Sequence, residues 1–273
     1  MITAEGFGLE GPRGRVFRDI TFTAPAGSLI AVEGASGSGR TCLLLSLTGR
    51  MRATEGRAEV AGLRLPKQLA AVRRVAALGP VAGVSELDPA LTVGEHLRER
   101  ALLRRRFGGS LRELLRPGGT EGARVDEALS AAGLDLSALP KAERTAARDL
   151  ERLEALRLGT ALALLARPEV LAVDDTDHKL APAERERAWA MLRGIAANGT
   201  TVLAVCTQAP EDAVVVRTRA PVADDHADDH ADGHATEPDA EHRAEHRDEH
   251  RDEHRDDTDE EGAADAHAEA GSA

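Results

Sequence analysis

The sequence of 273 residues contains no tyrosine, and aromatic residues make up only 2% of it. The Arg-rich run at 104–106 has no aromatic side chains interleaved with it. We therefore expect a solvated helix face there and no nucleic-acid partner, because RNA and single-strand binders stack bases on aromatic rings. Cysteine is also scarce. Cys42 and Cys206 lie in apolar segments outside any paired-cysteine motif, which predicts two buried thiols and no disulfide framework.

Long apolar runs are missing too. No stretch approaches the apolar length needed to span a bilayer, and the N-terminus lacks a charged-then-apolar signal pattern. These two absences predict a cytoplasmic protein.

Charge is divided unevenly along the chain. From Asp224 onward, 20 Asp and Glu stand against 4 Arg, a local net charge of −16, so the −12 of the whole chain leaves about +4 for the part before it. This break predicts a folded domain over residues 1–219 and a low-complexity tail over 220–273.

Histidines recur every four residues in this tail. That spacing would place them on one face of a helix, where they could chelate Zn²⁺, Ni²⁺ or Co²⁺. The same period stacks Glu on Glu and Arg on Arg, which disfavours the helix, so disorder is the main expectation and metal binding the alternative. The candidate ligands are His226, His230, His234, His242, His246, His250 and His254.

Short apolar segments alternate with helical ones before the tail, which predicts an α/β fold with a mostly parallel sheet flanked by helices. A stretch at about 93–160 predicts an inserted helical subdomain. On the helices, Trp189 and Met191 are expected in the core, and His96 and His178 at the surface. The expected strands are 16–22, 29–32, 58–61, 75–78, 170–173, 201–206 and 214–216, and the expected helices include 40–49, 151–166 and 182–197.

A glycine-rich loop follows the second of these strands and carries the clearest chemistry. Its residues are Gly34, Ala35, Ser36, Gly37, Ser38, Gly39, Arg40 and Thr41, which match Gly-x-x-x-x-Gly-Lys-Ser/Thr at every fixed position except the lysine. Glycines let consecutive backbone N–H groups point at phosphate oxygens, and the helix beginning at Arg40 adds its positive N-terminus. Thr41 offers a hydroxyl to Mg²⁺, and the Arg40 guanidinium keeps the positive charge.

Four more segments accompany this loop in a fixed order. Residues 170–175 read Val-Leu-Ala-Val-Asp-Asp, a buried strand with Asp174 at its carboxyl end, placed to hold Mg²⁺ through water. The others are 157–169, 199–205 and 87–97. Together with the opening at 16–27, these pieces resemble the ATP-binding subunit of ABC transporters over residues 1 to about 215.

The resemblance implies a P-loop ABC cassette that binds ATP and Mg²⁺. It also implies head-to-tail homo- or heterodimers that sandwich two ATPs, and a membrane permease subunit as partner. A cytoplasmic protein bound peripherally at the inner face of the cell membrane follows from it.

Several family motifs are altered in this sequence. Leu150–Glu154 stands where the family has Leu-Ser-Gly-Gly-Gln, and Asp175 replaces the catalytic Glu. Thr207 occupies the place of the switch histidine, and 177–181 replaces the usual D-loop. The segment at 81–83 lacks its glutamine, and with no tyrosine the sequence leaves Phe17 as the substitute candidate for adenine stacking.

These changes predict an ATP-binding subunit that hydrolyses ATP slowly or not at all. Whether Asp175 suffices as a catalytic base stays open at this point, as does the chain's status as an enzyme. Two alternatives remain: a nucleotide-dependent regulatory or interaction protein that does not drive transport, and a metal-handling protein that works through its His-rich tail.

Overall fold

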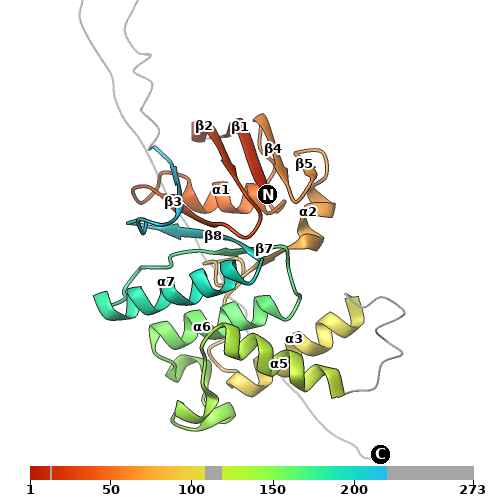
Figure 1. The fold of residues 1–273 in the computed structure, drawn as a ribbon, viewed down its shortest axis with the longest axis vertical. Coiled ribbons are helices and arrows are strands. Elements are labelled where there is room, and N and C mark those ends of the chain that lie inside the picture. The colour runs from red at the N-terminus through yellow and green to blue at the C-terminus, as the bar shows by residue number, and fades with distance from the viewer. Residues whose placement is uncertain (13, 108–118, 220–273) are drawn as a thin grey trace, which may run out of the picture. The chain divides into compact units, whose positions relative to one another are not determined.

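The structure, a computed structural model, describes residues 1–12, 14–107 and 119–219 (Figure 1). Its centre is a parallel sheet of five strands in the order β6-β7-β8-β3-β9. Every adjacent pair in this sheet is parallel. The strands are β3 (Leu29–Glu33), β6 (Ala76–Leu78), β7 (Val170–Val173), β8 (Thr201–Cys206) and β9 (Val214–Arg217).

A second sheet of four strands is antiparallel, in the order β2-β1-β4-β5. Its strands are β1 (Ile2–Gly11), β2 (Gly14–Ala24), β4 (Glu55–Val60) and β5 (Leu63–Leu65). In Figure 1, α1 lies between this sheet and the parallel sheet. Helices α6 and α7 lie on the other side of the parallel sheet.

The described α-helices range from 7 to 16 residues in length. They are α1 (Arg40–Leu47), α2 (Leu69–Val75), α3 (Val93–Phe107), α5 (Gly119–Ala131), α6 (Arg152–Leu164) and α7 (Pro182–Ala197), with short 3-10 helices η1 (Leu136–Ala138), η2 (Ala142–Arg144) and η3 (Ala147–Asp149). Pro182 begins α7 at a position where a missing N–H costs nothing.

Two hydrophobic cores cover the two faces of the parallel sheet. Because side chains alternate along a strand, Leu171 and Val173 join the core formed with α6 and α7. Their neighbour Ala172 joins the other core, with α1 and the antiparallel sheet. This double burial explains why the central strands read as continuous apolar runs in the sequence.

The expected α/β architecture with a mostly parallel sheet and flanking helices is confirmed. Trp189 and Met191 are buried, as expected. The expectation for His96 is wrong: it is buried, and a ring nitrogen lies 3.1 Å from the Asp88 carbonyl oxygen, so the imidazole has a hydrogen-bond partner inside the protein.

The 220–273 tail, and with it every candidate tail ligand, lies outside the described residues. Across the residues described, no helix combines the length and apolar character needed to cross a bilayer.

Candidate functional site

The loop from Gly34 to Thr41 connects β3 to α1 at the carboxyl edge of the parallel sheet. Gly37 and Gly39 have φ angles of 80° and 81°, a region that favours glycine. A Cβ on Gly39 would lie 2.3 Å from the Val16 carbonyl oxygen of β2, so a side chain there would collide with the neighbouring sheet. The loop is therefore curled and closely backed, as the sequence motif predicts.

A hydrogen bond between two buried hydroxyls connects the 34–41 loop to the residue after β9. Ser38 and Thr218 are both buried, and their side-chain oxygens are 2.6 Å apart. A Cβ on Gly34 would lie within 2.5 Å of both oxygens, which explains the glycine at that position. Thr218 follows β9, and its N–H donates to the Glu33 carbonyl at the end of β3 (2.9 Å). Sequence motifs gave no sign that residues 180 apart would meet here.

Thr41 and Asp174 form the candidate magnesium site. The Thr41 hydroxyl donates to Asp174 Oδ2 at 2.7 Å, and the Asp175 N–H donates to Asp174 Oδ1 at 2.9 Å. Burial raises the pKa of Asp174, and the charge of Asp175 adds to this effect, whereas the Thr41 hydrogen bond opposes it. The structure thus places both sequence-predicted ligands together as hard oxygen donors, the type that Mg²⁺ prefers. The buried carboxylate carries a charge that a bound cation would offset.

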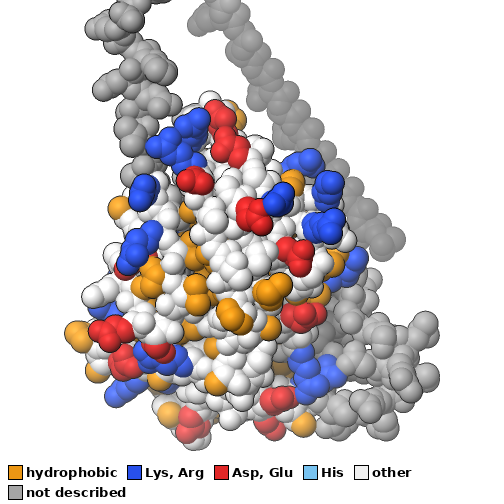
Figure 2. Space-filling model, turned by 45° about the horizontal axis from the view of Figure 1, so that its top comes forward, with side chains coloured by type: hydrophobic (Ala, Val, Ile, Leu, Met, Phe, Trp, Pro, Cys, Tyr) orange, Lys and Arg blue, Asp and Glu red, His pale blue; other side chains and the backbone are white. Residues whose placement is uncertain are grey.

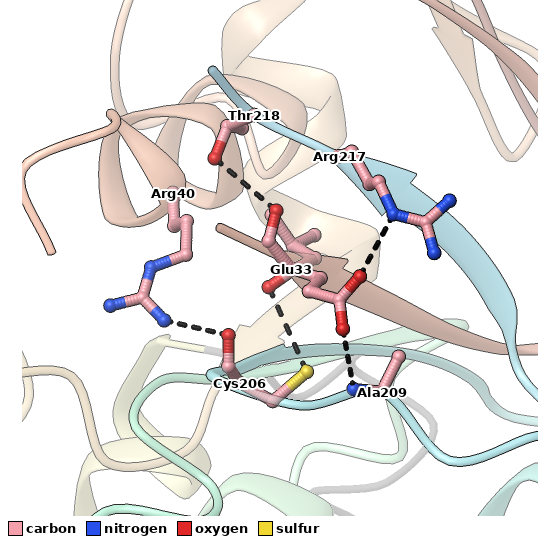
Figure 3. Close-up of polar contacts among 7 residues, drawn as sticks. Glu33, Arg40, Cys206, Ala209, Arg217 and Thr218 are labelled. Atoms are coloured by element: carbon pink, nitrogen blue, oxygen red, sulfur yellow. Dashed lines mark hydrogen bonds and ion pairs between the residues drawn. The ribbon is translucent and has the colours of Figure 1, made fainter. Parts of the chain in front are cut away.

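Arg40, the residue in place of the motif lysine, reaches across the carboxyl edge to β8. Its Nη1 donates to the Cys206 carbonyl oxygen at 2.6 Å, as Figure 3 shows. Cys206 is a free, buried thiol, and burial raises its pKa to about 12, so it is inert at neutral pH. Cys42 is also free but only partly buried, so the expectation of two buried thiols holds fully for Cys206 alone.

The segment that follows β8 is held by carboxylates. The Asp177 side chain accepts hydrogen bonds from the N–H and hydroxyl of Thr207 and from the N–H of Gln208. The Glu33 side chain accepts from the Ala209 N–H at 3.0 Å and also pairs with Arg217 (Figure 3). Thr207 therefore lies directly after β8, as the sequence predicts. Its N–H and its hydroxyl both donate hydrogen bonds to the Asp177 carboxylate. Sequence reasoning did not anticipate this contact.

Asp175, the candidate base, has a φ of 47° and lies in the turn that follows β7. Its carbonyl oxygen lies 3.4 Å from Nη2 of Arg152, and Arg152 Nε lies 3.4 Å from the His178 carbonyl oxygen. Arg152 is the first residue of α6, in the segment that replaces the family signature. The replaced segment is thus tied to the turn after β7 within the same chain.

The N-terminus of α6 carries its own acidic cap. Glu154 Oε2 accepts a hydrogen bond from the Glu151 N–H at 2.9 Å. A carboxylate at a helix N-terminus is stabilising, so this end of the helix is already supplied with negative charge. A second anion approaching it would meet repulsion.

Phe17, the candidate for adenine stacking, does not fit that role. It is 2% exposed, and its ring packs against Phe7 with 6.0 Å between centroids. Because both faces of a core ring are covered by protein, the sequence-based expectation is wrong.

The described residues contain no group of three or more His, Cys, Asp or Glu side chains arranged to hold a metal ion. The predicted tail ligands lie beyond those residues. The face drawn in Figure 2 carries Lys and Arg side chains beside Asp and Glu side chains, in line with the small net charge before the tail.

Comparisons with known proteins agree with this geometry. A family model described as ABC transporter matches residues 17–178, more than half of the chain. A Nod factor export ATP-binding protein I from Rhizobium johnstonii is 29% identical over 188 residues, which are 69% of this chain and 55% of that protein. A daunorubicin resistance ATP-binding protein from Streptomyces coeruleorubidus is 31% identical over 199 residues, 72% of this chain and 57% of that protein.

The chain thus spans about half the length of the curated relatives it matches. Among solved structures, a dimeric bacterial ABC transporter cassette superposes with a TM-score of 0.63 at 19% identity. That match covers 81% of this chain and 95% of the other, and at this identity it speaks for the fold.

Asp174→Asn is expected to raise the thermal stability of the protein at pH 7 in the absence of Mg²⁺ and nucleotide. The raised pKa of Asp174 means that the folded state prefers the protonated form, so stability is lost as pH rises through that pKa. Asparagine removes the charge, keeps one acceptor oxygen for the Asp175 N–H, and can donate its amide N–H to the Thr41 hydroxyl in place of the bond it accepts. The gain in melting temperature over wild type should therefore shrink as pH falls toward about 4.

Asp135→Asn is the matched control of opposite sign. Hydrogen bonds from the Ser137 hydroxyl and N–H lower the pKa of Asp135, so its contribution is present at neutral pH and lost on acidification. This variant should melt below wild type at pH 7, with the gap closing at low pH. An Asp174→Asn variant that melts below wild type at pH 7 would contradict the expected cost of burying the Asp174 charge.

Proposed function

Because this chain belongs to the ABC transporter family, we propose that it is the ATP-binding subunit of an exporter and hydrolyses ATP slowly or not at all. The observation that carries the proposal is the 2.7 Å contact between Thr41 and Asp174 beside the curled 34–41 loop. The elements for binding Mg-ATP stand together, whereas the groups for hydrolysis are replaced or bonded elsewhere.

Triphosphate binding rests on the loop backbone. Consecutive N–H groups of a glycine-rich turn, with the N-terminus of α1 behind them, form a site for phosphate oxygens. Arg40 supplies the one charged side chain of the loop, and its guanidinium can bind phosphate through two N–H groups. For this it leaves the Cys206 carbonyl, to which it is bonded in the structure.

Magnesium would be held by the Thr41 hydroxyl and, through water, by Asp174. The ion supplies charge neutralisation between the phosphate oxygens when bound. The chain's own part is to present two oxygen ligands 2.7 Å apart at the carboxyl ends of β7 and the loop, in positions fixed by buried strands.

The residues at the positions where the family has its hydrolytic groups are poorly suited to hydrolysis. A general base must lie within hydrogen-bond reach of the attacking water, and Asp175 is one methylene shorter than glutamate. Thr207 carries no positive charge, and its hydroxyl donates to Asp177 at 3.0 Å. At the α6 N-terminus, Glu154 would repel the γ-phosphate of a partner's ATP.

Transport as the setting is supported by the family and by two relatives, a Nod factor export ATP-binding protein and a daunorubicin resistance ATP-binding protein. A membrane permease and a second cassette are the partners we propose, with the chain at the cytoplasmic face of the cell membrane. A cavity of about 260 Å³ lies between the 84–87 segment, α3 and α6. Val84 and Leu103 line it beside Glu86, Glu99 and Arg100, and are 53% and 44% exposed, which suits a docking contact that combines apolar and charged groups.

Nucleotide binding is tested by calorimetry with Mg-ATP. We expect wild type to bind and Arg40→Ala to bind about 10- to 100-fold more weakly, the value of one to two charge-assisted contacts. Arg40→Lys, which restores the motif residue, should bind at least as well as wild type. Arg74→Ala, at an exposed arginine of α2, is the matched control and should bind as wild type does. Binding by Arg40→Ala that equals wild type would place the ligand elsewhere.

Turnover is measured on the same preparation. We expect a rate below the order of 1 s⁻¹ that is typical of enzymes, and Asp175→Asn should change it little. A faster wild-type rate that Asp175→Asn abolishes would show that Asp175 suffices as base, and the claim of slow hydrolysis would fall.

Docking is tested by purifying the full chain with membranes of its own organism. A membrane permease should co-purify with wild type, and Val84→Asp or Leu103→Asp should weaken the association at least tenfold, because a charge replaces an apolar side chain that the partner would cover. Leu102→Asp is the control, since Leu102 is exposed on the same helix but does not line the cavity. ATP-dependent soluble complexes without a permease would support the regulatory alternative.

A further inference from the structure

A buried carboxylate outside the nucleotide-binding motif joins two edges of the site. Asp177 follows β7 by four residues and is 6% exposed. Its Oδ1 lies 3.0 Å from the Thr207 hydroxyl and 3.1 Å from the Thr207 nitrogen, and its Oδ2 lies 2.9 Å from that nitrogen. Oδ2 also accepts from the Gln208 N–H at 3.1 Å. Both oxygens are therefore committed to the segment after β8.

The hydrogen bonds to this carboxylate come from backbone N–H groups and one hydroxyl. Over the part of the chain that the structure describes, Asp177 forms no ion pair with Lys, Arg or His. Successive backbone N–H groups in a turn form an anion-binding concavity. Here the turn at 207–208 is already filled, and its anion is a side chain of the same protein.

The rest of the segment is fixed in the same manner. The Ala209 N–H donates to the Glu33 carboxylate, so three consecutive amides are bound to acidic side chains. On the other side, Arg40 donates to the Cys206 carbonyl, the residue just before Thr207 (Figure 3). The segment from Cys206 to Ala209 is thus bonded to β3, to the nucleotide loop and to the turn after β7.

We propose that Asp177 is a positioning residue that holds the Thr207–Ala209 segment in one conformation, so that the site does not distinguish nucleoside triphosphate from diphosphate. The inference rests on the proposed binding of nucleotide at the 34–41 loop. It adds a statement of which nucleotides the site binds equally well. A ligand shifts an equilibrium only by its differential affinity for two states. A segment with a single state gives the γ-phosphate no second conformation to stabilise, and the donors of this segment are occupied by Asp177 and Glu33.

Removing the carboxylate should free these donors. In Asp177→Ala, amide exchange at Thr207 and Gln208 in the nucleotide-free protein should rise about tenfold or more, because each amide loses a bond to a charged acceptor. The freed N–H groups and the Thr207 hydroxyl are then available to a γ-phosphate. The ratio of Mg-ADP to Mg-ATP dissociation constants, within about threefold in wild type, should rise at least fivefold in the variant.

Asp135→Ala is the matched control, because Asp135 also accepts a backbone N–H, from Ser137 at 2.8 Å, but does so as the N-cap of η1, outside the segments bonded to Asp177. It should leave both readouts unchanged. If Asp177→Ala fails to fold, Thr207→Val and Thr207→Ser decide: the valine removes one donor to Asp177 and should raise exchange at Gln208, and the serine, which keeps the hydroxyl, should restore it. If Asp177→Ala lowers the melting temperature but leaves the ratio of Mg-ADP to Mg-ATP dissociation constants unchanged, Asp177 only stabilises the fold and the proposal is wrong.

Each outcome has a distinct meaning. Unchanged exchange in Asp177→Ala overturns the proposal, and so does a wild-type protein whose 207–209 exchange or affinity differs more than tenfold between the two nucleotides. A wild type that binds neither nucleotide refutes the proposed function, and the exchange measured without nucleotide still decides whether Asp177 holds the segment.

Discussion

The parallel pairing of β8 with both β3 and β7 is the constraint on which the rest of the site depends. Its register sets Glu33 opposite Cys206 and Val173 opposite Ala204, so the three strands end nearly level. Loops that leave level strand ends meet at one edge of the sheet, which is where open α/β folds bind ligands. Thr41 meets Asp174 and Thr207 meets Asp177 for this reason, although 133 and 30 positions separate the partners in sequence.

Level strand ends also bring acidic side chains together, and their partners decide what each can do. Asp174 shares its oxygens with one hydroxyl and one N–H, and burial raises its pKa, so it gains most from a cation. Asp177 and Glu33 are engaged by backbone amides, and Glu33 also by Arg217. The first carboxylate is free to change partners, whereas the other two hold the segment after β8 in place.

The sequence predicts the fold well because its strongest signals are local. The buried strands at 170–173 and 201–206 are continuous apolar runs with the observed bounds, and the glycines at 34, 37 and 39 announce a loop whose backbone requires them. The antiparallel strand β1 was not predicted, because its glycines interrupt the alternation on which such a prediction depends. Nor could local pattern show that Ser38 meets Thr218 or that Asp177 meets Thr207, since these contacts follow from which strands become neighbours.

Three residues at altered family positions form hydrogen bonds within their own chain, which only the structure reveals. Arg40 donates to Cys206, Thr207 to Asp177, and Arg152 to the carbonyl oxygens of the turn after β7. A buried polar group left without a partner costs free energy, so these contacts help to stabilise the fold. Residues that must meet a substrate or a second subunit only in passing cannot satisfy one another in this way. These contacts therefore fit the nucleotide-binding role that we propose, in which slow turnover accompanies a site held in one conformation.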